Sequence, residues 1–126
     1  MIRNEKAQAK VVAVTPVIFD LSGTLRRLGG DTNLLSDLVQ LYDEDSPGLI
    51  SRLHAGIESH QTDEVRHAAH SLRGLAANFG ATVLTQSLLR LEETAAEGRL
   101  DDAAALLERV SQDSARLQAT LALHRH

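Results

Sequence analysis

Apolar residues recur every three or four positions along most of the chain, beginning at Phe19. Side chains at this spacing lie on one side of an α-helix, so the pattern predicts helices that each bury one face. The scarcity of aromatic residues and the abundance of leucine and alanine favour the same conclusion. In chain order the apolar stripes are Leu21, Leu25 and Leu28; Leu34, Leu35, Leu38, Leu41 and Tyr42; Leu49, Ile50, Leu53 and Ile57; Val65, Ala68, Ala69, Leu72, Leu75, Ala76 and Phe79; Leu84, Leu88, Leu91 and Ala95; and Ala105, Leu106, Val110, Leu117 and Leu121.

Glycine, proline and capping residues divide these stripes into separate helices. Gly29-Gly30 ends a short first helix, after which Asp31 or Thr32 is expected to cap the second one. Ser46-Pro47-Gly48 lies within the second helical segment and could break it or only kink it, because proline is tolerated in the first turn of a helix. Since the apolar spacing resumes directly afterwards, we expect a bend at this point.

Similar signals mark the later helices. Thr62, followed by two acidic residues, is the expected N-cap of a further helix, and Gly80 is its expected C-terminal stop. The next helix is expected to end near Gly98, and Asp101 is expected to cap the last one. Short turns between amphipathic helices predict that neighbouring helices run antiparallel.

These elements predict an all-α protein, an antiparallel four-helix bundle with a short extra helix at its N-terminal end. The bundle domain is expected over residues 18–123, since a chain of 126 residues suits a single core. Residues 1–17 show no helical period and contain Pro16, so we interpret them as a flexible lead-in or linker.

Composition and charge narrow the classes of function. The chain has no cysteine, which excludes disulfides, cysteine zinc sites and thiol catalysis and fits a reducing compartment. A net charge of −4, without a stripe of lysine and arginine, argues against nucleic-acid binding. No apolar stretch is long enough to span a membrane. We therefore expect a cytoplasmic protein that binds neither nucleic acid nor membrane.

The helix expected over residues 62–80 carries polar and small residues on the side away from its apolar stripe. Successive residues of a helix turn by about 100°, which places the two groups on opposite sides. A histidine on the second side is therefore expected to be open to solvent. That side carries His70, Gly74 and Ala77, with His67 and Asn78 next to them and Arg73 at one flank.

Gly74 follows His70 by one turn, and glycine costs about 1 kcal/mol relative to alanine inside a helix. Its lack of a side chain leaves the imidazole accessible to an approaching group, and the small side chain of Ala77 leaves space in the next turn as well. Arg73, three residues after His70, is close enough to bind an anion held on the imidazole. An exposed histidine, an adjacent cation and a cleared surface together indicate a phosphoryl acceptor.

Glu92 is a candidate partner for the imidazole from the following helix. If the chain reverses near Gly80, antiparallel register places His70 level with residue 91 or 92. Leu91 belongs to the apolar stripe, so Glu92 is expected to face the seam and accept a hydrogen bond from one ring nitrogen. This contact would fix the tautomer and leave the other nitrogen as the nucleophile.

The segment Ala69-His70-Ser71-Leu72-Arg73-Gly74 resembles the signature of histidine-containing phosphotransfer (HPt) domains of multistep phosphorelays. The resemblance covers about residues 18–115. It continues through Phe19-Asp20, Leu28-Gly29-Gly30-Asp31, Leu41-Tyr42-x-x-Asp45-x-Pro47, Asn78-Phe79-Gly80-Ala81 and Leu91-Glu92.

This resemblance implies a helical bundle that takes phosphate from the aspartyl phosphate of one receiver domain and passes it to another. By position, His70 would be the phosphoacceptor, supported by the basic Arg73, the clearance residue Gly74 and the polar Glu92. The family usually has lysine at position 73; arginine keeps the charge but is bulkier and bidentate. The receiver-docking residues are expected to include His67, Ala77 and Asn78.

The resemblance also implies what the protein needs from other molecules. Receiver domains of response regulators, a hybrid sensor histidine kinase, or both would be its partners, and the chain would act as a monomer. The receiver would supply the magnesium ion and the aspartate, so we expect a phosphoryl carrier that is not an enzyme and has no cofactor, ATP site or metal site of its own.

Three alternatives remain at this point. Glu64, His67 and His70 share one helix face and could bind a metal, although a di-iron bundle needs a second Glu-x-x-His, which is absent. A helical adaptor could keep the fold without the transfer, but an intact His70 argues against it. A phosphotransfer domain of the chemotaxis type would receive phosphate directly from an ATP-binding kinase domain, although the motif looks more like the relay type.

Overall fold

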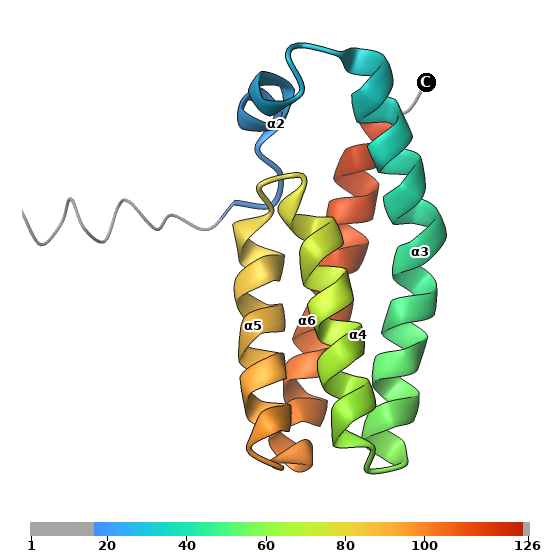
Figure 1. The fold of residues 1–126 in the computed structure, drawn as a ribbon, viewed down its shortest axis with the longest axis vertical. Coiled ribbons are helices and arrows are strands. Elements are labelled where there is room, and N and C mark those ends of the chain that lie inside the picture. The colour runs from blue at the N-terminus through green and yellow to red at the C-terminus, as the bar shows by residue number, and fades with distance from the viewer. Residues whose placement is uncertain (1–16, 125–126) are drawn as a thin grey trace, which may run out of the picture.

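Four long helices lie side by side in an antiparallel bundle, and a short helix covers one end (Figure 1). The computed structural model describes residues 17–124, so all but the last residue of the expected lead-in over residues 1–17 lies outside the described part. The predicted fold class is confirmed. The helices are α2 (Leu21–Arg27), α3 (Thr32–Glu58), α4 (Thr62–Ala77), α5 (Thr82–Ala96) and α6 (Leu100–Leu121), followed by a 3-10 turn, η1 (Ala122–His124).

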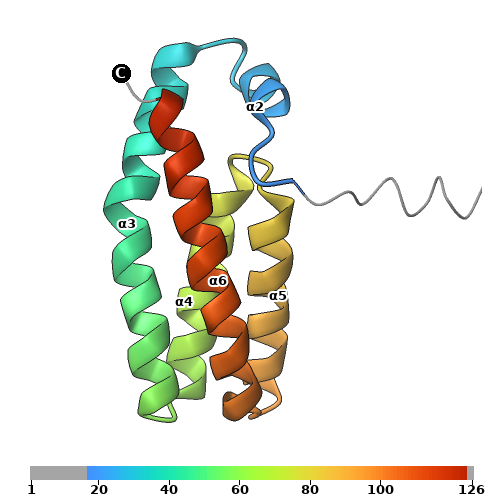
Figure 2. The ribbon, with the colours of Figure 1, turned by 180° about the vertical axis from the view of Figure 1, so that it is seen from behind.

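The order of the helices around the bundle places α4 and α6 on opposite sides. α4 packs between α3 and α5, and α6 closes the bundle by packing on α5 and α3. Figure 1 views the molecule with α4 in front of α6, and Figure 2 shows α6 in front from behind. None of the helices within residues 17–124 is long and apolar enough to cross a membrane.

Most residues of the predicted apolar stripes form the core. The stripe predicted for α6 is partly wrong, because Ala105 is exposed while Ala103 and Leu107, which it omitted, are buried. On α4, Val65, Ala68, Ala69, Leu72 and Ala76 are fully buried, whereas Leu75 at the edge of the stripe is half-buried. Tyr42 brings a hydroxyl into this core, where it lies 2.8 Å from the Ser114 hydroxyl. Burial raises the pKa of Tyr42 to about 12, so the phenol stays neutral at physiological pH.

Helix α3 runs through Pro47, so of the two alternatives at this point the break is wrong. The helix is continuous from Thr32 to Glu58, so Ser46-Pro47-Gly48 does not break it. Both views show a bowed helix, in keeping with the expected bend. Pro47 is exposed, and the missing hydrogen bond is tolerated because a long helix that curves around a core can lengthen or lose bonds on its solvent side.

Two predicted N-caps and one predicted helix end are wrong. The N-cap of α4 is Gln61 and that of α6 is Arg99, and neither side chain makes a capping hydrogen bond. Thr62 is instead the first residue of α4, and Asp101 lies in the first turn of α6, where acidic groups favour the helix dipole. α4 ends at Ala77, before Gly80, because the chain already turns there and Gly80 takes a positive φ of 58°. The N-cap of α3 is Asp31, one of the two candidates.

The segment before α3 holds the turn that follows α4. The Asp20 backbone N–H donates to the Phe79 carbonyl at 2.8 Å. The carbonyl of Asn78 accepts from the Arg27 guanidinium at 3.1 Å and from the Thr24 hydroxyl at 3.3 Å. These bonds satisfy carbonyl groups that the end of a helix leaves without partners. They also hold the C-terminal end of α4 in place.

Candidate functional site

His70 lies near the middle of α4, on the face turned away from the core. Its side chain is 70% exposed, while the neighbouring Ala69 and Leu72 are fully buried. His67, Gly74, Ala77 and Asn78 are exposed as well. The helical period therefore predicted correctly which residues of α4 face the core and which face solvent.

Glu92 of α5 reaches His70 across the seam between the two helices. Its Oε1 lies 3.3 Å from Nδ1 of His70, and its side chain is 18% exposed. The neighbouring Leu91 is fully buried, so the register predicted from the α4–α5 turn is correct. A half-buried carboxylate beside the ring is well placed to accept a hydrogen bond from Nδ1–H.

Arg73 joins the same group. Its Nε donates to Oε2 of Glu92 at 2.5 Å, and its Nη2 lies 3.2 Å from Nδ1 of His70. The hydrogen bond to Glu92 raises the pKa of Arg73, so the guanidinium keeps its charge at every relevant pH. Sequence analysis placed Arg73 near His70 but missed its ion pair with Glu92. The available signal was the opposite charge of two residues that each face the α4–α5 seam.

The two contacts at Nδ1 are alternatives. The Glu92 carboxylate only accepts hydrogen bonds and the Arg73 guanidinium only donates them, whereas Nδ1 of a neutral ring does one or the other. When Nδ1–H donates to Glu92, the lone pair is on Nε2. Nε2 has no hydrogen-bond partner among residues 17–124, so the ring presents this nitrogen to solvent.

Gly74 leaves open space beside this ring. A Cβ built on Gly74 would have no other atom within 4 Å, and its φ is not positive, so neither packing nor backbone geometry requires glycine there. With His70, Arg73 and Ala77 it lines a hollow of about 360 Å³ that continues over the α4–α5 turn to Thr85. The hollow gives an incoming group access to the imidazole.

The alternative metal site is not assembled. Glu64 is engaged by Arg52 of α3, whose Nε lies 2.6 Å from Oε1, and this hydrogen bond lowers the pKa of Glu64. Within residues 17–124 the structure brings no three histidine or carboxylate side chains together in a way that could hold a metal ion. Glu64, His67 and His70 share one helix face as predicted, but they do not converge.

Comparisons with known proteins agree with this geometry. The family model for the Hpt domain matches residues 37–122, which is more than half of the chain. Among solved structures, the chain is similar to histidine-containing phosphotransfer protein B (HptB) from Pseudomonas aeruginosa PAO1, with a TM-score of 0.80 and 26% identity over 88% of this chain and 96% of that one. A search of curated proteins found no match. The chain therefore belongs to the Hpt domain family and is a histidine phosphotransfer intermediate of phosphorelays, a phosphoryl carrier and not a classical enzyme.

Proposed function

We propose that His70 is the phosphoacceptor of this domain and that Nε2 is the atom that carries the phosphoryl group. The observation that carries the proposal is the environment of the ring. Nδ1 faces Glu92 and Arg73, whereas Nε2 points to solvent. Beside the ring lies Gly74, a glycine that neither packing nor backbone geometry requires. No other histidine within residues 17–124 forms an ion pair with a carboxylate.

In the proposed reaction, the Nε2 lone pair attacks the phosphorus of an aspartyl phosphate on a receiver domain. The P–N bond forms as the P–O bond to the aspartate breaks, and the aspartate leaves as a carboxylate with the bonding electron pair. Positive charge that develops on the ring is stabilised by Glu92, which accepts the hydrogen bond from Nδ1–H. Transfer to a second receiver reverses these steps.

This chemistry needs little from the domain beyond a positioned nucleophile and a surface for the receiver. The receiver would supply the aspartate and a magnesium ion, while this chain would use no ATP or metal site of its own. His67, Ala77 and Asn78 would lie at the edge of the docked receiver, since all three are exposed near His70. We propose that the domain works as a monomer in the cytoplasm, with response-regulator receivers, a hybrid sensor histidine kinase, or both as its partners.

Incubation with two kinds of phosphoryl donor tests this proposal. Purified protein is mixed either with a phosphorylated receiver domain or with ATP and an isolated kinase domain of the chemotaxis type. We expect rapid acid-labile labelling from the receiver and none from the kinase domain. Labelling from the kinase domain alone would contradict the relay function and favour the chemotaxis-type alternative.

Arg73→Ala is expected to slow transfer from the receiver by about 10- to 100-fold, because the nearest fixed positive charge to the phosphoryl oxygens is lost. It should also change the lifetime of the phosphohistidine. Arg73→Lys should have a mild effect, since it keeps the charge. Rapid-quench transfer assays on the three proteins provide the measurement, and a parental rate for Arg73→Ala with every receiver would remove Arg73 from the mechanism.

Gly74 allows stability and transfer to be separated. Gly74→Ala should stabilise the domain by up to about 1 kcal/mol, because helix propensity improves and a Cβ there meets no atom within 4 Å. Gly74→Leu should fold normally but screen His70 and prevent receiver docking, and Gly74→Gln should do the same.

Melting curves and transfer rates on the same Gly74 variants provide the measurement. Gly80→Ala is the matched control for stability, since Gly80 has a positive φ and its added Cβ would lie 2.9 Å from Cβ of Asp20. That variant should melt below the parent. Normal transfer by Gly74→Leu, or a marked loss of stability in Gly74→Ala, would refute a clearance role for Gly74.

A further inference from the structure

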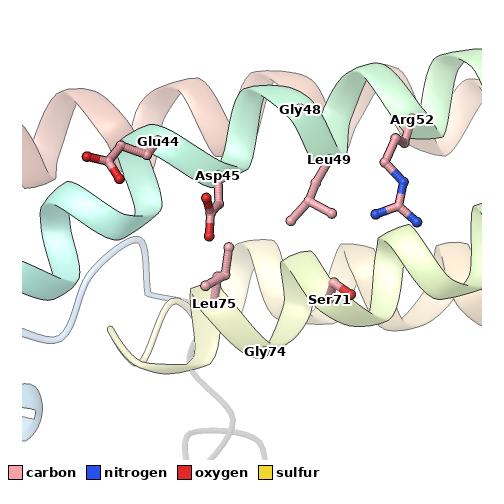
Figure 3. Close-up of a pocket in the computed structure, with 8 residues that line it drawn as sticks. All are labelled: Glu44, Asp45, Gly48, Leu49, Arg52, Ser71, Gly74 and Leu75. Atoms are coloured by element: carbon pink, nitrogen blue, oxygen red, sulfur yellow. The ribbon is translucent and has the colours of Figure 1, made fainter.

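A second hollow, which we call the α3–α4 groove, lies between α3 and α4 on the same side of the molecule as Gly74 (Figure 3). Its walls follow the helical period, with neighbours three or four residues apart on each helix, so each helix presents one continuous stripe to it. The groove has a volume of about 660 Å³. It is lined by Glu44, Asp45, Gly48, Leu49 and Arg52 of α3 and by Ser71, Gly74 and Leu75 of α4.

Two glycines inside helices line this groove. Gly48 resembles Gly74 in three respects: it is exposed, its φ is not positive, and an added Cβ would meet no atom within 4 Å. Glycine within a helix lowers stability relative to alanine, and here neither packing nor backbone geometry requires it. Sequence analysis assigned Gly48 only to the interruption at Pro47. Bare backbone on both walls is what the close approach of another molecule requires.

The α3–α4 groove is continuous with the hollow at His70. Gly74 lines both, and Ser71 in the groove directly follows His70 in the chain. A protein that places an aspartyl phosphate at His70 would therefore also lie over the near end of the groove. The contact of that protein with this chain would then extend along the groove from α4 onto α3.

The chemistry of the groove changes along its length. Leu49 and Leu75 are both half-buried; Leu49 lies in the middle of the groove and Leu75 lies opposite Asp45, with Glu44 beyond Asp45 at one end and Arg52 at the other (Figure 3). Arg52 is neutralised by Glu64, at 2.6 Å. Asp45 forms no ion pair within residues 17–124. The uncompensated charge of the groove is thus negative and lies beside an apolar floor.

We propose that the α3–α4 groove is the part of the receiver-docking surface that selects among receivers. It would seat an apolar side chain of the receiver over Leu49 and Leu75, next to a lysine or arginine that pairs with Asp45 and Glu44. Gly48 is the clearance residue of this groove, as Gly74 is for His70. The proposal rests on the proposed function, since the occupant is the receiver that exchanges phosphate with His70.

Added bulk at Gly48 tests the groove. Gly48→Leu is compared with Ala115→Leu, which adds a similar side chain to an exposed position of α6, on the opposite side of the bundle from α4. His70 labelling is measured with a phosphorylated receiver and, separately, with phosphoramidate, a small donor that needs no docking surface. For Gly48→Leu we expect the ratio of the receiver-driven rate to the phosphoramidate rate to fall about tenfold, through a higher KM. Ala115→Leu should leave the ratio unchanged.

Charge reversal at Asp45 tests the chemistry of the occupant. Asp45→Lys should raise KM for the cognate receiver and weaken its dependence on salt, because it removes an attraction at the contact. Changing the pairing lysine or arginine of the receiver to glutamate should restore transfer to Asp45→Lys. Glu108→Lys on α6 is the matched control, because Glu108 is exposed on the far side of the bundle.

The outcomes separate the groove from the phosphoacceptor. If His70 is labelled by both donors, and neither Gly48→Leu nor Asp45→Lys alters the KM for any receiver, the groove proposal is overturned while the proposed function stands. If neither donor labels His70 in the parental protein, the proposed function itself has failed.

Discussion

His70→Gln is expected to abolish phosphate acceptance completely while leaving helix content and melting close to those of the parent. The side chain is 70% exposed and contributes little to the core, so its loss should change the free energy of unfolding by no more than about 0.5 kcal/mol. Glutamine keeps polar character at the surface but offers no nucleophilic nitrogen, which removes the covalent step itself. The measurement is labelling from a phosphorylated receiver, with circular dichroism melting on the same sample.

His67→Gln is the matched control for this result. His67 is also exposed on α4, one turn before His70, but no carboxylate lies within ion-pair distance of its ring in the described part of the chain. This variant should accept phosphate at the parental rate. Label that persists in His70→Gln, or that disappears in His67→Gln, would move the phosphoacceptor away from His70.

Leu72→Ala is expected to have the largest effect on stability, a loss of about 2 to 5 kcal/mol. Leu72 is fully buried on the core face of α4, so truncation removes buried apolar contacts and leaves a cavity in the core of the bundle. Because the whole stability of a small domain is about 5 to 15 kcal/mol, such a loss could unfold much of the protein at physiological temperature.

Ser71→Ala is the control for Leu72→Ala, since Ser71 is exposed on the adjacent position of the same helix. It should change stability by about 0.5 kcal/mol or less. Urea or thermal unfolding of the two variants gives the comparison. Equal losses would mean that α4 is rotated about its axis, and the exposure of His70 would then be in doubt as well.

The fold and the histidine face were predictable because they depend on periodicity. Every residue predicted for the apolar stripe of α4 is buried or half-buried, and His70 on the opposite face is exposed. The position of Glu92 was predictable too, since a short turn fixes the register of two antiparallel helices. Periodicity has limits even here, because Leu34 and Leu41 of the predicted α3 stripe are 41% and 39% exposed.

Features that depend on contacts between distant segments were not predictable in the same way. Thr62 and Asp101 have the residue types of N-caps, but α4 begins one residue earlier, and α6 two residues earlier, than such caps would allow. The bonds from Thr24 and Arg27 to the Asn78 carbonyl join segments that are more than 50 residues apart. Gly48 could be recognised as a groove residue only once the structure placed it opposite α4.

A relay between two receivers tests the central claim most directly. A first receiver, loaded with labelled aspartyl phosphate, is mixed with an excess of an unlabelled second receiver and a small, substoichiometric amount of this protein. If His70 carries phosphate between receivers, label should reach the second receiver in amounts exceeding the protein present, with a transient acid-labile phosphohistidine at His70. Label that never leaves the first receiver, or that reaches the second equally well with His70→Gln, would contradict the account.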